Sequence, residues 1–262
     1  MSNRIQNELS EGKYVVGPFM KLASPAIVEI MGKAGFDYVI IDCEHGPTNM
    51  LQAEDMVRAA KLVGISPVIR VSANDPVMIS RALDIGADAV QVPQISTKED
   101  AERVAKAAKF APLGERGSCP YVRAAEYSHL DKKEYFKKAN EETMVIIHIE
   151  GEEGAKNIDE ILSVEGIDVI FIGPYDLSQS LGVPGEVDHP KVVEMMEMVV
   201  EKAKGKGKTV GTFVESPEGA HRWIDLGVQY ISYAGDTGII YQACKDIMQQ
   251  IQSVEAISQD QI

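Results

Sequence analysis

The chain has 262 residues, of which 45% are hydrophobic and 25% charged, and its formal net charge is −14. This length suffices for one α/β barrel or two small domains, and the composition is ordinary for a soluble globular protein. The negative charge argues against nucleic acid and anionic membranes as partners, because both are bound by clustered lysine and arginine. No apolar run is long enough to cross a bilayer, and segment 1–13 lacks the features of a secretory signal, so we expect a cytoplasmic protein.

Eight short apolar runs with helical patterns between them are predicted to be β-strands. They cover residues 14–20, 38–43, 67–71, 89–92, 144–149, 169–172, 209–214 and 230–233. Four of them follow a glycine that suits the left-handed end of a helix: Gly35, Gly86, Gly166 and Gly227. Eight strands alternating with helices predict one (β/α)8, or TIM, barrel domain over residues 1–262. A doubly wound open sheet is the alternative, weakened because no Gly-x-Gly-x-x-Gly turn follows the first strand.

Two segments stand apart from this pattern. Residues 111–140 form a longer connection than usual, which is typical of a lid, a binding loop or an oligomer contact. Residues 253–262 are a polar tail without an evident role. The three cysteines are too few and too scattered for a disulfide framework or a structural zinc site.

Four of the predicted strands lead into ionisable residues. The second leads to Asp42, Glu44 and His45, and the other three lead to Arg70, to His148 and Glu150, and to Asp176. A charge at the end of a buried strand is costly unless it is paired, metal-bound or exposed in a cleft. In a barrel, the carboxyl ends of the strands converge on the place where active sites are built. We therefore expect these side chains to form one site.

Glu150 and Asp176 are predicted to be neighbours because they end adjacent strands. Two such carboxylates suit the acid and base of a glycosidase, or the ligands of a hard divalent cation. Asp176 could instead be the N-cap of a helix that starts there. We favour a metal site, since Arg70 and His45 lie near in the inferred ring, and without thiolates the ion would be Mg²⁺, Mn²⁺ or Co²⁺. Such an ion would polarise the ketone of a 2-oxo acid and favour its enolate.

Arg70 and His45 are the candidates for handling charge and protons. Arg70 could form a structural salt bridge, but in an acidic protein its planar fork also suits a carboxylate or enolate oxygen. His45 has acidic neighbours, Asp42 and Glu44, that would orient it and raise its basicity. It is therefore a candidate proton acceptor near neutral pH.

Three further residues fall at the same end of the predicted barrel. His148 lies two residues before Glu150, so strand alternation points both side chains the same way. Lys21 ends the first strand and could form a Schiff base, but this requires an apolar setting that a polar centre does not offer. Cys43 is read as a small packing residue in preference to a reactive thiol.

These residues, with the turns around them, resemble those of the HpcH/HpaI aldolase family. The resemblance extends from Gly17 to about Met248. It depends on the segments AGFD (34–37), IDCEHGP (41–47), PVIR (67–70), NDP (74–76), PLGERG (112–117), IE (149–150) and GPYDLS (173–178).

The resemblance implies a phosphoenolpyruvate/pyruvate-type barrel, usually hexameric, in which the last helix packs on a neighbouring barrel. It implies a class II pyruvate aldolase that cleaves 4-hydroxy-2-oxo acids to pyruvate and an aldehyde. Glu150 and Asp176 would be the metal ligands, and His45 the proton acceptor. Arg70 would stabilise the enolate, and Asp84 would raise the basicity of His45. Because Asp84 falls near the end of a predicted helix, it would reach His45 through a partner subunit or an irregular loop.

The implied substrate contacts include positions at which this chain departs from the family's type member. The contacts are Arg70, His148, Gly173, Pro174, Tyr175 and Asp176. His148 stands where the type member has glutamine, Tyr175 replaces a small residue, and Phe19 replaces tryptophan. The specificity of the type member should therefore not be transferred.

Three hypotheses follow from this sequence. The first is retro-aldol cleavage, in which His45, acting with a water, removes the C4 hydroxyl proton and Arg70 stabilises the pyruvate enolate. The second is decarboxylation of oxaloacetate at the same metal–enolate site. The third is a non-catalytic barrel that binds a metabolite.

Overall fold

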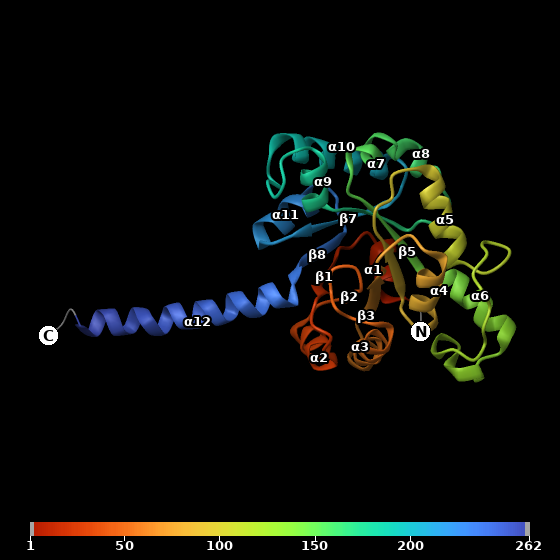
Figure 1. Cartoon of the computed structure of the whole chain (residues 1–262), viewed down its shortest axis with the longest axis horizontal. Coiled ribbons are helices and arrows are strands. Elements are labelled where there is room, and N and C mark those ends of the chain that lie inside the picture. Colours follow the sequence, from red (N-terminus) through yellow and green to blue (C-terminus); the bar gives the residue numbers. More distant parts are fainter. Residues whose placement is uncertain (1–2, 260–262) are drawn as a thin grey trace.

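The computed structural model describes residues 3–259, and the side chains of residues 3–253, as a closed barrel of eight parallel strands (Figure 1). The strands are β1 (Val15–Met20), β2 (Tyr38–Asp42), β3 (Ser66–Arg70), β4 (Ala89–Val92), β5 (Met144–Ile149), β6 (Val169–Ile172), β7 (Thr209–Val214) and β8 (Tyr230–Gly235). Each strand pairs with the next along the chain, and β8 closes the barrel against β1. The predicted TIM barrel is confirmed, and no predicted strand end differs from the observed one by more than two residues.

Helices connect the strands and cover the outside of the barrel (Figure 1). They are α1 (Arg4–Ser10), α2 (Pro25–Ala34), α3 (Met50–Val63), α4 (Pro76–Asp84), α5 (Lys98–Ala108), the 3₁₀ helix η1 (Arg123–Ser128), α6 (Lys132–Glu142), α7 (Glu152–Lys156), α8 (Ile158–Ile161), α9 (Pro174–Ser180), α10 (Pro190–Gly205), α11 (Pro217–Asp225) and α12 (Asp236–Gln259). The glycine that precedes β2, Gly35, ends α2 with a φ of 102°, a left-handed conformation that favours glycine. Gly86, Gly166 and Gly227 have the same left-handed backbone, as the repeated motif predicted.

The barrel interior is apolar near its amino-terminal end and polar at its carboxyl end. The rings of Tyr38 and Tyr230 stack across the interior with centroids 4.4 Å apart. A Cβ at Gly17 would collide with Tyr38, so only glycine leaves room there for the ring. Ile5 and Leu9 of α1 join this inner cluster. Because side chains alternate along each strand, the inner row of β2 ends in Asp42 and that of β5 continues through His148 to Glu150.

The last helix, α12, projects away from the barrel, at the left of Figure 1. One side of it carries apolar residues that remain exposed: Ile240, Tyr241, Ile247, Met248 and Ile251. The expected polar tail is helical as far as Gln259, and residues 260–262 lie outside the described residues. Within the described part of the chain, no helix is long and apolar enough to cross a membrane.

The long connection 111–140 contains η1 and α6. It has a small apolar cluster of its own, formed by Phe110, Ala125 and Tyr135. η1 contacts α4 on the outside of the barrel. This segment therefore folds beside the barrel wall and does not cross the mouth of its own barrel.

Candidate active site

The carboxyl ends of the strands bring most of the predicted site residues to one cavity of about 350 Å³. Arg70 reaches the cavity from the end of β3, and His148 and Glu150 reach it from the end of β5. Asp176 lies in the first turn of α9. His45 reaches the same cavity from the loop after β2, as do Gly173, Pro174 and Tyr175 from the start of α9. The cleft that the sequence predicted from the strand ends is therefore present.

Asp42 lies beneath this cavity and is fully buried. Arg70 forms a bidentate ion pair with Asp42: its Nε donates to Oδ1 at 2.9 Å and its Nη2 donates to Oδ2 at 2.7 Å. The Lys21 ammonium contacts the same carboxylate, and the backbone N–H groups of Glu44 and His45 donate to Oδ1. Burial disfavours the charge on Asp42, but the bonds from Arg70 and Lys21 outweigh burial and hold its pKa far below the usual value. Asp42 therefore positions Arg70 and the His45 loop from below.

Glu44 and His45 occupy the rim. Oε2 of Glu44 lies 2.9 Å from Nη1 of Arg70, and burial raises the pKa of the Glu44 carboxyl group despite this cation. The His45 side chain is 61% exposed, and its Nε2 lies 3.9 Å from Oε2 of Glu44. An exposed imidazole at the mouth of the cavity can reach a substrate or a water there, as a proton acceptor must.

Glu150 is held by two donors on opposite sides. The backbone N–H of Gln94, a residue with a left-handed φ of 59°, donates to Oε1 at 2.7 Å, and Nδ1 of His148 lies 2.8 Å from Oε2. His148 stacks on Phe171 with centroids 4.6 Å apart, and its Nε2 lies 2.6 Å from the amide nitrogen of Gln91. Burial opposes the charge of Glu150, but the His148 side chain and the Gln94 bond lower its pKa. Glu150 is therefore an oriented carboxylate.

The hydrogen bonds around His148 show which ring nitrogen donates to Glu150. The Tyr230 hydroxyl donates to Oε1 of Gln91 at 3.2 Å, which leaves the amide N–H₂ of Gln91 facing Nε2 of His148. His148 then donates its Nδ1 proton to Glu150. The sequence placed His148 near Glu150 correctly, whereas nothing in it indicated Gln91 or Gln94 as supports.

Asp176 differs from Glu150 in having no hydrogen-bond or ion-pair partner among the described residues. The N-cap of α9 is Gly173, so Asp176 lies inside the first turn and the N-cap interpretation was wrong. Within the described residues its carboxylate makes no hydrogen bond or ion pair, although it lines the cavity with Glu150. A Cβ at Gly173 would lie 2.9 Å from Oε2 of Glu150, so glycine allows the start of α9 to pack closely against that carboxylate. One oriented and one unpartnered carboxylate fit a hard divalent cation, which prefers oxygen ligands.

Aromatic residues line another side of the cavity. The rings of Phe19 and Phe213 lie 5.9 Å apart, and Phe213 meets the ring of Tyr175 edge-on at 5.9 Å. The Tyr175 hydroxyl donates to Oε2 of Glu215 at 2.6 Å. Burial, with the hydrogen bond to Glu215 and its charge, raises the pKa of Tyr175 to about 12. Glu215 was missed in the sequence, although it follows β7 directly, as the predicted site residues follow their strands.

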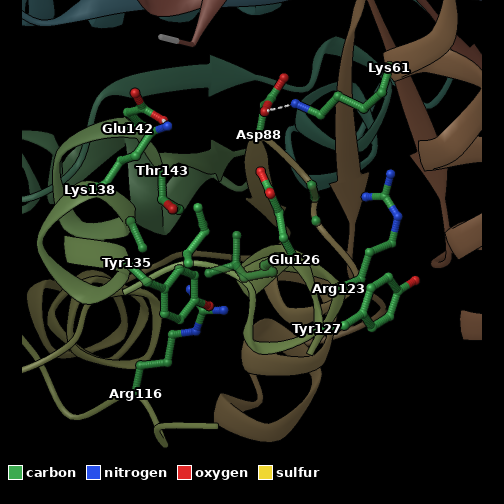
Figure 2. Close-up of a pocket in the computed structure, with 16 residues that line it drawn as sticks. Lys61, Asp88, Arg116, Arg123, Glu126, Tyr127, Tyr135, Lys138, Glu142 and Thr143 are labelled. Atoms are coloured by element: carbon green, nitrogen blue, oxygen red, sulfur yellow. Dashed lines mark hydrogen bonds and ion pairs between the residues drawn. The ribbon is translucent and has the colours of Figure 1, made fainter. Parts of the chain in front are cut away.

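Asp84 lies at the other end of the barrel, so this chain does not bring it to His45. Nη2 of Arg116 donates to Oδ1 of Asp84 at 2.6 Å. Arg116 lines a cavity of about 380 Å³ that also includes Asp88 and Glu142, which precede β4 and β5 (Figure 2). Asp84 is far from His45 because of the direction of α4. This helix starts at the carboxyl end of β3 and runs back along the outside of the barrel, so Asp84, its last residue, lies at the amino-terminal end of the barrel. That end of a TIM barrel generally contributes to stability.

Two other sequence interpretations can be compared with the geometry. The Lys21 ammonium pairs with the buried Asp42 carboxylate, which is not the apolar setting of a Schiff-base lysine. Cys43 packs against the core, and burial raises its pKa to about 11. Both observations agree with the sequence-based preference against a nucleophile at these positions.

Comparison with known proteins agrees with this arrangement. The HpcH/HpaI aldolase/citrate lyase family model matches residues 16–243. A 4-hydroxy-2-oxo-heptane-1,7-dioate aldolase of Escherichia coli is 32% identical over 246 residues, covering 94% of this chain and 93% of the relative. A 2-keto-3-deoxy-L-rhamnonate aldolase of Salmonella gallinarum is also 32% identical, over 98% of this chain and 96% of the relative.

A solved structure is similar along the whole barrel. It is a HpcH/HpaI aldolase/citrate lyase family protein from Burkholderia cenocepacia, with a TM-score of 0.91 at 30% identity over 96% of this chain and 100% of the other. Sequence and fold thus agree over nearly the full length of these relatives. The chain belongs to the HpcH/HpaI aldolase/citrate lyase family and is a carbon–carbon lyase.

Proposed function

We propose that this protein is a metal-dependent class II pyruvate aldolase that reversibly cleaves a 4-hydroxy-2-oxo acid into pyruvate and an aldehyde. The observation that carries the proposal is the single cavity that Glu150 and Asp176 share with Arg70 and His45. The aldolase names of two relatives at 32% identity support it.

Glu150 and Asp176 would hold the cation, which we propose to be Mg²⁺, Mn²⁺ or Co²⁺ because both ligands are oxygens. When bound, such an ion polarises the ketone of the 2-oxo acid as a Lewis acid. His148 and the Gln94 N–H fix the orientation of Glu150 before the ion arrives, as outer partners of metal ligands generally do.

The remaining steps belong to side chains at the rim. His45 accepts the proton of the C4 hydroxyl, directly or through a water, and the C3–C4 bond breaks to release the aldehyde. The electron pair of that bond moves onto the pyruvate fragment as an enolate. Arg70, which Asp42 holds by two hydrogen bonds, presents its guanidinium to the developing negative charge. The proton that His45 accepted is then transferred to C3, which gives pyruvate and restores His45.

The test is steady-state cleavage of a 4-hydroxy-2-oxo acid with and without EDTA, followed by re-addition of each metal. We expect EDTA to abolish cleavage and one of the three ions to restore it. Undiminished activity in the chelator would overturn the metal role, and borohydride trapping of a pyruvate adduct would assign the chemistry to Lys21. Faster turnover of oxaloacetate than of the 4-hydroxy-2-oxo acid would assign the site to decarboxylation.

We also propose that the working protein is a homo-oligomer, in which α12 packs on another copy. The support is the apolar side of α12, which remains exposed, on a helix that projects away from the barrel of the same chain (Figure 1). Exposed apolar stripes of this kind are typical of helices with a partner.

A further inference from the structure

The Tyr175–Glu215 pair stands at one edge of the active-site cavity. The two side chains are joined by the 2.6 Å hydrogen bond from the Tyr175 hydroxyl to Oε2 of Glu215. Both also line a second cavity of about 180 Å³, which continues towards Met196 and Trp223. The pair therefore separates the metal-side carboxylates from a smaller space between α9, β7, α10 and α11.

The charges around this pair are negative. Asp188 and Glu215 line the second cavity, and among the described residues no lysine or arginine does. Arg222, outside the lining, lies 3.9 Å from Asp188 in an exposed ion pair and does not pair with Glu215. The two basic side chains of the active-site cavity, Lys21 and Arg70, are both bound to Asp42, and Arg70 also faces Glu44. A second carboxylate on the substrate would find no unpaired lysine or arginine in the described lining of either cavity.

The same pair offers hydrogen-bond partners. Oε1 of Glu215 has no protein partner among the described residues, so it can accept a hydrogen bond from a substrate. The Tyr175 oxygen donates to Glu215 and still has lone pairs that can accept a second bond. The neighbouring rings of Phe19 and Phe213 give the wall an apolar surface against which a short carbon chain can pack.

We propose that the Tyr175–Glu215 pair binds the far end of the acceptor aldehyde, and that this end is uncharged and carries a hydroxyl group. The inference rests on the proposed aldolase function and extends it to the substrate class. A distal carboxylate is disfavoured because it would face Glu215 without a compensating cation. A plain alkyl end is disfavoured because it would cover Glu215 and Tyr175 without replacing their bonds to water.

The test is the condensation of pyruvate with matched aldehydes in the presence of the activating metal. The set is glyceraldehyde and propanal, which differ in hydroxyl groups, and succinate semialdehyde and butanal, which differ in a carboxylate. We expect kcat/KM for glyceraldehyde to exceed that for propanal and for succinate semialdehyde by at least about tenfold, since one uncompensated charge or polar group costs that much. Equal or better use of succinate semialdehyde or of propanal by the wild type would overturn the proposal.

Two variants locate the effect. In Glu215→Gln, which keeps the side-chain size and removes the charge, we expect the preference for glyceraldehyde over succinate semialdehyde to fall at least about fivefold. In Tyr175→Phe we expect the preference for glyceraldehyde over propanal to fall. Glu218→Gln, on the exposed surface of α11 and outside both cavities, removes the same charge and should leave both preferences unchanged. Preferences that stay at wild-type values in both site variants would refute the assignment to this pair.

A measurement without an aldehyde separates this inference from the proposed function. Exchange of deuterium into the methyl group of pyruvate reports enolate formation alone. If deuterium exchange occurs but glyceraldehyde is not preferred, only the assignment of the acceptor aldehyde to the Tyr175–Glu215 pair is wrong. Absence of both exchange and cleavage with every metal would defeat the aldolase function itself.

Discussion

At the residue scale, one buried carboxylate organises the rim of the site. Asp42 accepts hydrogen bonds from Arg70, from Lys21 and from two backbone N–H groups of the loop that carries His45. The sequence grouped Asp42 with His45 because they are neighbours in the chain. The tertiary structure shows that Asp42 contacts Arg70, on the adjacent strand β3, as closely as it contacts its own loop.

We predict that Asp42→Asn lowers the free energy of unfolding by about 3–5 kcal/mol at neutral pH, because it removes the charge that the buried Arg70 guanidinium contacts with two hydrogen bonds and leaves Arg70 only Glu44. The folded-state pKa of Asp42 lies below its unfolded value. Its ionised form therefore stabilises the fold above about pH 4, and this contribution is lost as the pH falls towards the folded-state pKa.

Urea unfolding of the wild type and the variant between pH 3 and pH 8 measures this effect. The difference between the two proteins should be largest above about pH 4 and should narrow below it. Asp55→Asn is the matched control, since Asp55 forms an exposed pair with Arg58 and its loss should cost less than about 1 kcal/mol. A difference that is the same at every pH would contradict the assignment.

At the element scale, the strands place the site residues by simple alternation. Inward positions on β5 run through Ile146 and His148 to Glu150, and those on β7 run through Phe213 to Glu215. Side chains two residues apart on a strand point to the same side, and this rule identified His148 beside Glu150. Applied to β7, the same rule identifies Glu215. The prediction missed Glu215 because it used the ends of the first, second, third, fifth and sixth strands and not the end of the seventh.

The helix α12 has an apolar side that the barrel of the same chain leaves exposed. It projects from the barrel (Figure 1). Its residues Tyr241, Ile247 and Ile251 are exposed on one side of the helix. We predict that Ile247→Glu combined with Ile251→Glu moves the protein to a smaller species in sedimentation velocity, because charges in an apolar interface are costly. Gln249→Glu, on the opposite side of the helix, adds charge without this effect and is the control. An unchanged sedimentation coefficient in the double variant would exclude α12 from the interface.

At the scale of the whole molecule, binding of metal and pyruvate at the mouth should stabilise the entire barrel. A ligand at about 100 times its Kd adds about 2.7 kcal/mol to the folded state. For a chain of this size we therefore expect the Tm to rise by several degrees when Mg²⁺ or Mn²⁺ is added with pyruvate. Differential scanning calorimetry measures this shift.

Asp176→Asn is the variant to compare with the wild type in this calorimetry experiment. Because the Asp176 carboxylate has no partner among the described residues, its replacement removes no internal bond, and the ligand-free Tm should stay near that of the wild type. The shift on adding metal and pyruvate should be lost. A full shift in this variant would remove Asp176 from the proposed metal site.

The sequence by itself determined the barrel and most of the residues at its mouth. The recurring glycine before each of four strands, the lengths of the apolar runs and the charge that follows them are local features, and they depend on neighbours along the chain. They were enough to place Arg70, His148, Glu150 and Asp176 at one end.

Only the tertiary structure decided which groups meet through space. The separation of Asp84 from His45 depends on the direction in which α4 runs, and the Tyr175–Glu215 bond depends on how α9 lies against the end of β7. The support of Glu150 by a backbone N–H depends on the left-handed turn at Gln94. Each of these contacts joins segments that are distant in the chain, and their distances are set by packing around the closed barrel.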